Sequence, residues 1–316
     1  MKVAVLKGGR SLERGVSLRS AARVEDALAS LGHAMAPVDA GADLVTRLRE
    51  ERPDVAFVAL HGPGGEDGTA QELLEILGIP YTGPRVAACA LCMDKVASKH
   101  VLRAERIATP DWVAFNATAF HELGAADTLE EIEERLGFPL VVKPASQGSS
   151  LGVKFASSRD EVPAALVAAF SYDDRVLLER YVEGRELAVG VLGSEPLPIV
   201  EAIPREGDLF DFEARYEIGR TDYACPADLS EDEAADVAET AAAAYDELGC
   251  SGFARVDLML GPNGPEVLEV NAIPGLTDTS LFPMAAEAAG FSFEQLVERI
   301  VVLALEEPRD AATLPA

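Results

Sequence analysis

The sequence lacks any long uninterrupted apolar run, although hydrophobic residues make up 48% of its 316 positions. A membrane-spanning helix needs about 20 consecutive apolar residues, so we expect no membrane partner. The apolar run at the N-terminus covers only residues 3–6 and is followed by Gly8 and Gly9. That run is too short for a secretory signal peptide and is typical of a first β-strand. We therefore expect a cytoplasmic protein.

Lysine is scarce, because the chain has only six lysines and arginine supplies the other basic side chains. Acidic residues outnumber basic ones and leave a formal net charge of −27 at pH 7. A surface this acidic repels the phosphates of nucleic acids and of anionic lipids. The composition therefore excludes nucleic acid as an expected partner.

Cysteine is also rare, with four residues in all. Cys89 and Cys92 form a Cys-x-x-Cys pair, which could be redox-active or could be half of a zinc site. A structural zinc site needs four ligands, and neither Cys225 nor Cys250 belongs to a second close pair. The small residues around Cys89 predict the start of a helix, so we interpret all four as ordinary buried cysteines.

Strand and helix patterns alternate over residues 1–88, which we predict to form one domain. The expected elements are strands at residues 2–9, 54–62 and 79–83 and helices at residues 17–31 and 70–77. This alternation is typical of an open, doubly wound α/β sheet. Ligands of such sheets bind at the carboxyl ends of the strands, where Gly8-Gly9 and His61-Gly62 lie.

Two further domains are expected, at residues 89–182 and 183–308, followed by a tail at residues 309–316. The first begins with helices and ends with strands that flank a loop rich in glycine and serine. The second combines β-hairpins, a helix capped by Ser230 and a final helix. It also contains a long irregular stretch at residues 206–227, and long ordered loops in compact domains are usually functional.

Four polar residues occupy alternate positions in two strands joined by a Pro-Asn-Gly turn. Residues i and i+2 of a strand share a face, so a hairpin places Arg255 and Asp257 beside Glu269 and Asn271. Two carboxylates and an amide oxygen suit magnesium, and arginine suits phosphate or carboxylate. A solvated strand face with a cross-strand ion pair explains the same pattern equally well.

Lys143 ends an apolar strand and is followed by a loop containing Gly148, Gly152 and three serines. Glycine lets backbone N–H groups approach phosphates closely, and serine hydroxyls add donors. The loop is not a Walker A motif, and a flexible surface loop is an equal alternative.

Three more residues are candidates for ligand binding. Glu179 ends a strand and, with Glu186, could contact adenine or ribose at an interdomain hinge, although surface acids are the commoner case. His61 precedes a glycine-rich turn, where an imidazole can donate to a bound carboxylate or simply cap the turn.

Many short motifs occur in a fixed order along the chain. They are GGRSLERGVSL, LHGPGGEDG, YTG, MDK, PLVVKP, GSS-x-GV, ERYVEGRE, YACPA, RVD and EVNAIPGLTDTSL. Together they resemble the D-alanine–D-alanine ligases of the ATP-grasp superfamily over residues 3–305. The resemblance implies a three-domain α/β ATP-grasp fold, with an N-terminal doubly wound parallel-sheet domain and ATP held between two α+β domains. Residues 89–182 would be the lid domain and residues 183–308 the catalytic domain.

The resemblance also implies an activity. Such an enzyme joins two D-alanines to D-alanyl-D-alanine through an acyl phosphate, with release of ADP and phosphate, for peptidoglycan precursor synthesis. It would use ATP and two Mg²⁺ ions, with Mn²⁺ as an alternative. A homodimer formed through the N-terminal domain is expected.

Substrate and catalytic roles follow for residues that match the family motifs. Glu13 would hold the ammonium of the first D-alanine, with His61 near its carboxylate. Arg255 and the Gly275 backbone would stabilise the oxyanion. Ser280 and Leu281 would seat the carboxylate of the second D-alanine. Ser149 and Tyr216 would close the site by hydrogen bonding with Glu13.

Nucleotide and metal roles follow in the same way. Lys95 and Lys143 would contact the phosphates of ATP. The remaining nucleotide contacts would come from Ser149, Glu179, Tyr181, Val182, Glu186 and Arg215. Asp257 would bind one magnesium, Glu269 would bridge two, and Asn271 would bind the second. Arg215 stands where the family often has a lysine, and Gly15 where it often has an acid.

Two other functions compete with this interpretation. One is an ATP-grasp ligase for a different carboxylate and amine, which Glu13, His61 and Ser280 argue against. The other is a nucleotide-binding regulatory protein without activity, which would not need all four polar residues of the hairpin. Tyr216 favours D-alanine over D-lactate as second substrate, because related resistance ligases carry histidine in that loop.

Overall fold

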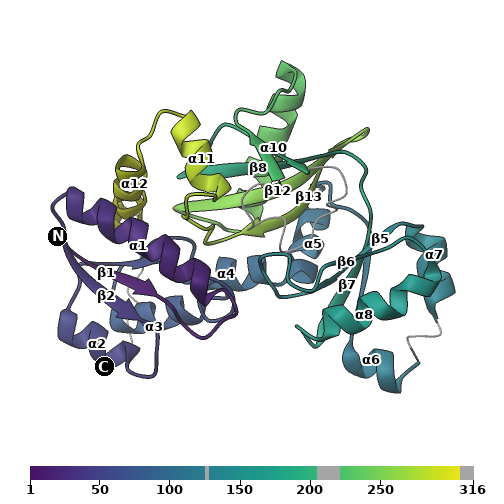
Figure 1. The fold of residues 1–316 in the computed structure, drawn as a ribbon, viewed down its shortest axis with the longest axis horizontal. Coiled ribbons are helices and arrows are strands. Elements are labelled where there is room, and N and C mark those ends of the chain that lie inside the picture. Colours follow the sequence, from purple (N-terminus) through teal and green to yellow (C-terminus); the bar gives the residue numbers. More distant parts are fainter. Residues whose placement is uncertain (125–127, 205–220, 307–316) are drawn as a thin grey trace.

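The computed structural model describes residues 1–124, 128–204 and 221–306, which form three β-sheets with helices packed on them (Figure 1). The first sheet is parallel, with strand order β2-β1-β3. Its elements are β1 (Lys2–Lys7), α1 (Arg14–Ser30), β2 (Ala34–Asp39), α2 (Leu44–Glu51), β3 (Val55–Val58) and α3 (Thr69–Leu77). The strand predicted at residues 79–83 is reduced to one parallel bridge between Ala56 and Tyr81.

Alternate residues of β1 face opposite sides of this sheet, as the geometry of a strand requires. Val3 and Val5 belong to a core with α1, whereas Ala4 and Leu6 belong to a second core with α2 and α3. Because β1 and β3 are buried on both faces, they are continuous apolar runs, whereas β2 at the edge of the sheet is only partly buried. The predicted doubly wound α/β fold is confirmed for this part of the chain.

The two last helices, α11 (Leu281–Ala288) and α12 (Phe293–Glu306), complete one of these cores. Their buried side chains pack with α1 and with the first sheet, and Figure 1 shows α12 beside α1. One hydrophobic core therefore joins the first and the last described segments of the chain, which the sequence pattern did not predict.

The second sheet is antiparallel, with strand order β4-β7-β5-β6. Its strands are β4 (Trp112–Asn116), β5 (Leu140–Pro144), β6 (Lys154–Ala156) and β7 (Arg175–Arg180). Its helices are α6 (Ala117–Glu122), α7 (Leu129–Leu136) and α8 (Val162–Phe170), preceded by a short 3₁₀ turn at Arg159–Glu161. Side chains of α7 and α8 cover one face of the sheet and form a separate core.

The third sheet is antiparallel, with strand order β11-β10-β8-β12-β13, and β9 pairs with β8. Its strands are β8 (Arg185–Leu192), β9 (Glu195–Pro196), β10 (Val200–Pro204), β11 (Thr221–Ala224), β12 (Phe253–Gly261) and β13 (Gly264–Asn271). Helix α10 (Glu231–Glu247) packs on one face through Val237, Ala241, Ala244 and Tyr245.

Helices α4 (Val86–Met93) and α5 (Lys95–Ala104) pack on this third sheet, because Cys89, Cys92 and Leu102 belong to the core that it shares with α10. The boundary predicted at residue 89 falls inside α4, and the division into three domains stays a prediction.

The cysteines are free thiols, and Cys89 and Cys92 are buried as expected. Cys225 and Cys250 are only half-buried, so the prediction of four buried cysteines is wrong for these two. The Sγ of Cys250 lies 3.6 Å from the Sγ of Cys92, a contact that the sequence spacing did not predict. Within the described ranges, no helix has the length and apolar character needed to cross a bilayer.

The first turn of α10 is held by a capping box. The Oγ of Ser230 accepts a hydrogen bond from the backbone N–H of Glu233, and the Ser230 N–H donates to the Glu233 carboxylate at 2.9 Å.

We expect Ser230→Ala to lower the free energy of unfolding by about 1 kcal/mol, because the backbone N–H of Glu233 loses its acceptor. Urea unfolding would measure this. Ser171→Ala, which removes an exposed serine at the end of α8, is the control, and an equal loss in both variants would contradict the assignment.

Candidate active site

The hairpin of β12 and β13 carries four polar residues on one face. Arg255 lies directly opposite Asn271, and Asp257 lies directly opposite Glu269. The intervening Val256 packs into the core with α10. The side-by-side arrangement predicted from the period of a strand is therefore confirmed.

This polar face is not a solvated surface. Asp257 is 3% exposed, and its two carboxylate oxygens accept from Nε and NH2 of Arg255 at 2.7 and 2.8 Å. The side-chain nitrogen of Asn271 donates to the same carboxylate at 3.0 Å. A bidentate pair replaces the hydration that the buried charges lose, so the alternative of an exposed ion pair is wrong.

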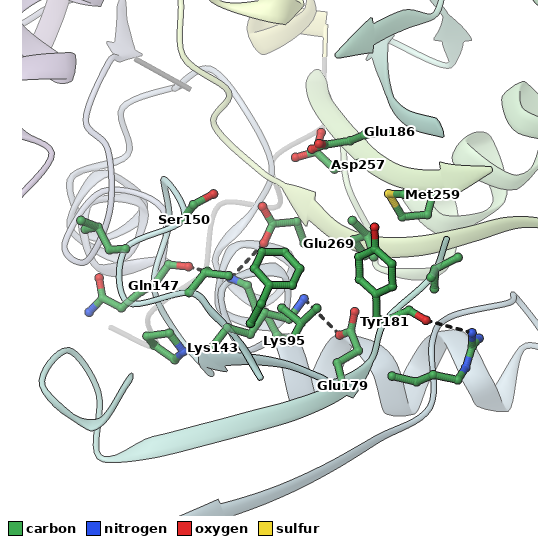
Figure 2. A pocket seen from close by; sticks show the side chains of 18 residues that line it. Lys95, Lys143, Gln147, Ser150, Glu179, Tyr181, Glu186, Asp257, Met259 and Glu269 are labelled. Atoms are coloured by element: carbon green, nitrogen blue, oxygen red, sulfur yellow. Dashed lines mark hydrogen bonds and ion pairs between the residues drawn. The ribbon is translucent and has the colours of Figure 1, made fainter. Parts of the chain in front are cut away.

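A cavity lies between this face and the four-stranded sheet, and it encloses about 800 Å³ of space, part of it open to solvent (Figure 2). Its apolar lining comes from Val141, Leu151, Val153, Phe155, Tyr181, Val182, Met259 and Leu268. Its charged lining comes from Lys95, Lys143, Glu179, Arg180, Glu186, Asp257 and Glu269. A cavity of this size with one apolar part and convergent charges fits a nucleotide.

Glu179, which is fully buried at the base of the cavity, is neutralised by two lysines. Its Oε2 lies 3.0 Å from the Nζ of Lys143 and 3.0 Å from the Nζ of Lys99. Burial alone would raise the pKa of Glu179, but the two lysines reverse this and lower it. Burial also lowers the pKa of Lys99 to about 8, although Glu179 opposes the shift. Both charges are retained in the interior because they lie together.

Glu269, which contacts Lys95 at the start of α5, lines both the nucleotide-sized cavity and a second, smaller one. The Nζ of Lys95 donates to the backbone carbonyl of Gln147 at 2.6 Å and lies 3.0 Å from Oε2 of Glu269. Lys95 and Glu269 both line the first cavity, and Glu269 also lines the second. The two spaces are therefore adjacent at a point where a lysine and a carboxylate meet.

The second cavity, of about 400 Å³, brings together predicted substrate residues from all three parts of the chain. Its polar lining comes from Glu13, His61, Glu66, Ser149, Arg255, Glu269 and Asn271, with Gly148 and Gly275 as glycine lining. Glu13 is 6% exposed and accepts a hydrogen bond from the Oγ of Ser149. The predicted contact between Glu13 and Ser149 is present in the structure.

Two glycines make room for the Glu13 carboxylate. A Cβ at Gly62 or at Gly148 would lie within 3 Å of its Oε2. Gly62 also has a φ of +71°, and Ser149 and Ser150 adopt left-handed backbone with φ of 52° and 56°. Such conformations cost energy in residues other than glycine. The glycine- and serine-rich loop is thus held in a specific conformation over Glu13.

Burial, and then the charge of Glu66, raise the pKa of Glu13 to about 7, against the opposing effects of Ser149, His61 and Lys95. His61 is 4% exposed, with Nδ1 3.0 Å from the carboxylate of Glu66 and Nε2 3.2 Å from the hydroxyl of Ser20. Both imidazole nitrogens therefore have protein partners, which restricts how His61 can act on a ligand.

The segment after β13 closes the second cavity. Gly275 lines it, and a Cβ at this position would lie 2.9 Å from the Oγ of Ser280. That Oγ accepts a hydrogen bond from the Thr277 N–H at 3.0 Å. Ser280 is the N-cap residue of α11, which begins at Leu281. The side chain of Leu281 packs on the core with α1. A backbone contact of Leu281 with a carboxylate at this helix N-terminus stays a prediction.

Of the remaining predicted residues, Tyr181, Val182 and Glu186 line the nucleotide-sized cavity. Glu186 lies on the same face of the third sheet as Asp257, because it pairs with Met259, and Figure 2 shows the two carboxylates together. Tyr216 and Arg215 lie outside the described residues.

Sequence reasoning missed three residues of the site. Glu66 lies in the motif LHGPGGEDG but was not predicted to belong to the site. Its position five residues after His61 could have indicated the contact that the two side chains make. Lys99 was one of only six lysines and follows Lys95 by one helical turn, which places both on one side of α5. Gln147 contributes its backbone carbonyl, for which no side-chain signal exists.

No group of three or more His, Cys, Asp and Glu side chains in the described part of the chain is arranged to hold a metal ion. The donor chemistry nevertheless fits Mg²⁺, because Asp257, Glu269 and Asn271 offer hard oxygen atoms on paired strands. Arg255 and Lys95 neutralise the two carboxylates, as a cation would.

Comparison with known proteins agrees with this geometry. The family model described as D-ala D-ala ligase C-terminus matches residues 101–302, and the one described as D-ala D-ala ligase N-terminus matches residues 39–84. The D-alanine–D-alanine ligase of Syntrophotalea carbinolica is 44% identical over 300 residues, 95% of each chain.

Two solved structures have the same fold. The D-alanine–D-alanine ligase of Bacillus anthracis complexed with ATP has a TM-score of 0.83 and 36% identity, with coverage of 96% of this chain and 97% of that one. A D-Ala:D-Ser ligase from Enterococcus faecalis has a TM-score of 0.80 and 28% identity, with coverage of 96% and 99%.

A cavity of nucleotide size between two antiparallel sheets, beside a doubly wound parallel domain, places the chain in the ATP-grasp class. Within that class, the chain belongs to the D-alanine–D-alanine ligase family.

The raised pKa of Glu13 gives a testable titration. Because its value of about 7 exceeds the ordinary 4.5, the folded state binds more protons between these two pH values. This group therefore makes the free energy of unfolding fall as the pH rises through that window. We expect carbon-13 NMR of the glutamate carboxyls to show one group titrating near pH 7. Glu66→Gln should move that midpoint to lower pH and Ser149→Ala to higher pH, whereas a midpoint that neither variant moves would refute the assignment.

Proposed function

We propose that this chain joins two D-alanines to D-alanyl-D-alanine, with release of ADP and phosphate, for the synthesis of peptidoglycan precursors. The observation that carries the proposal is the pair of adjacent cavities that share Glu269. One has the size and lining for ATP. The other combines an acid for an ammonium group, Glu13, with the arginine and the backbone that an oxyanion needs, Arg255 and Gly275.

In the first step, the carboxylate of one D-alanine attacks the γ-phosphoryl group of ATP, the bond from the γ-phosphorus to the β–γ bridging oxygen breaks, and ADP and an acyl phosphate result. Lys95 and Lys143 neutralise charge on the phosphates, and this electrostatic and positioning work is the main catalytic task in phosphoryl transfer. Ionised Glu13 pairs with the ammonium of this D-alanine. Since the pKa of Glu13 is about 7 in the free chain, binding weakens as the pH falls below that value.

In the second step, the amine of another D-alanine attacks the acyl phosphate, and phosphate leaves. Arg255 and the Gly275 N–H stabilise the oxyanion. The bidentate pair with Asp257 fixes the plane of the Arg255 guanidinium in advance of this charge. The loop that contains Gly148 and Ser149 covers Glu13 and excludes water from the acyl phosphate.

Asp257, Glu269 and Asn271 would hold two Mg²⁺ ions, or Mn²⁺, which would supply further neutralisation of the phosphate charge. A homodimer and a cytoplasmic location stay predictions.

An alternative is that the second substrate is not D-alanine. One of the two similar solved structures supports this alternative, because the protein from Enterococcus faecalis is a D-Ala:D-Ser ligase. A pocket for a methyl group rejects an added hydroxyl only weakly. The identity of 44% to a D-alanine–D-alanine ligase, against 28% to the D-Ala:D-Ser ligase, supports D-alanine.

Phosphate release from ATP tests the reaction. With Mg²⁺ and D-alanine we expect one phosphate for each D-alanyl-D-alanine found by mass spectrometry, and when D-serine or D-lactate is added we expect less D-alanyl-D-serine or D-alanyl-D-lactate than D-alanyl-D-alanine. L-alanine is the control substrate. Phosphate release with D-alanine that yields no dipeptide would overturn the proposed ligation, and ATP binding without any release would favour the regulatory alternative.

Glu269→Gln tests the carboxylate shared by the two cavities. We expect phosphate release to fall by about a hundredfold or more, because Glu269 would lose the negative charge with which it would hold Mg²⁺. Glu266→Gln is the matched control, since Glu266 lies on the same strand but pairs with Arg180 at 2.6 Å. Equal activity of the two variants would refute the role of Glu269.

A further inference from the structure

The backbone of Leu276, the residue after Gly275, is held at both ends by helix α1. Its N–H donates to the Oγ of Ser20 at 3.1 Å, and its carbonyl accepts from NH1 of Arg23 at 2.7 Å. Ser20 and Arg23 are three residues apart and therefore lie on the same face of α1. Ser20 is fully buried and Leu276 is 2% exposed, so water does not compete for the Ser20 bond.

Ser20 also joins Leu276 to the first-substrate side of the site. Its Oγ lies 3.2 Å from Nε2 of His61, whose Nδ1 lies 3.0 Å from Glu66. All contacts are satisfied when the Ser20 hydroxyl donates to Nε2, accepts from the Leu276 N–H, and the His61 Nδ1–H donates to Glu66. A continuous chain of hydrogen bonds thus runs from Glu66 to the peptide between Gly275 and Leu276.

Arg23 makes three contacts with residues that follow β13, namely Leu276, Asp278 and Phe293. Besides the Leu276 carbonyl, its guanidinium lies 3.9 Å from the centre of the Phe293 ring, and its Nε lies 2.9 Å from Asp278. The side chain of Asp278 is 87% exposed, so this ion pair contributes little. The carbonyl bond and the stacking on Phe293 are the contacts that restrict the position of Leu276.

We propose that Ser20 and Arg23 are positioning residues for the ligation reaction. They orient the Gly275–Leu276 backbone, and with it the Gly275 N–H. Glu13 is the N-cap residue of the same helix, so one rigid element sets the distance between the carboxylate for the substrate ammonium and the backbone donor for the oxyanion. The assignment rests on the proposed function, because it takes the Gly275 N–H as that donor.

Steady-state kinetics of Ser20→Ala and Arg23→Met test this assignment. A displacement of about 1 Å in a catalytic group costs up to about a hundredfold in rate, so we expect kcat to fall by about tenfold or more. The KM for ATP should stay within about twofold, because neither residue lines the nucleotide-sized cavity. Arg23→Lys should recover part of kcat, since an ammonium can still donate to the Leu276 carbonyl.

Two controls separate positioning from general destabilisation. Ser17→Ala removes an equally buried hydroxyl of α1, which bonds Gly8 and Ala59, and should lower Tm without the same loss of kcat. Asp278→Asn removes only the exposed ion pair and should leave kcat within about twofold.

Unchanged kcat in both Ser20→Ala and Arg23→Met would overturn the assignment, and so would a matching loss in Asp278→Asn or in Ser17→Ala. An inactive wild-type chain would instead refute the proposed function, so the two failures are distinguishable.

Discussion

Seven charged side chains are buried among the described residues, and they lie where the three sheets meet: Glu13, Lys95, Lys99, Lys143, Glu179, Glu186 and Asp257. Burial of an ion costs several kcal/mol unless partners replace its hydration. Partners therefore come from distant elements, as when Lys99 of α5 and Lys143 of β5 both contact Glu179 of β7. This requirement ties the second sheet to α5 and the hairpin to α5 through Lys95.

The same pairs prepare the site for a charged ligand. Lys95 and Arg255 neutralise carboxylates in the structure, and both carry donors that phosphate and an oxyanion can use. Because these groups are already held in place, little reorganisation is needed when ATP binds or the acyl phosphate forms, which is the usual source of electrostatic catalysis. Glu13 differs, since burial and the charge of Glu66 raise its pKa to about 7, and a cationic substrate group would favour its ionised form.

Helix α1 has a second constraint of its own. It packs on the first sheet and, through the core shared with α11 and α12, on the end of the chain. Its N-cap is Glu13, and its second and third turns contact Leu276 through Ser20 and Arg23. A single helix thus relates the proposed first-substrate site to the backbone beyond β13.

The sequence by itself determined the local geometry of this protein. A strand places residues i and i+2 on one face wherever it packs, so the set Arg255, Asp257, Glu269 and Asn271 could be predicted from spacing. The apolar runs of the first sheet and the cap of α10 follow from equally local rules. The ordered motifs, through family resemblance, supplied the roles proposed for Glu13 and Lys143. Only the tertiary structure decided that Lys99 contacts Glu179, that Ser20 contacts Leu276, and that α12 covers the first sheet. These contacts join residues up to 256 positions apart, and they depend on how separate apolar faces are buried together, which no local pattern encodes.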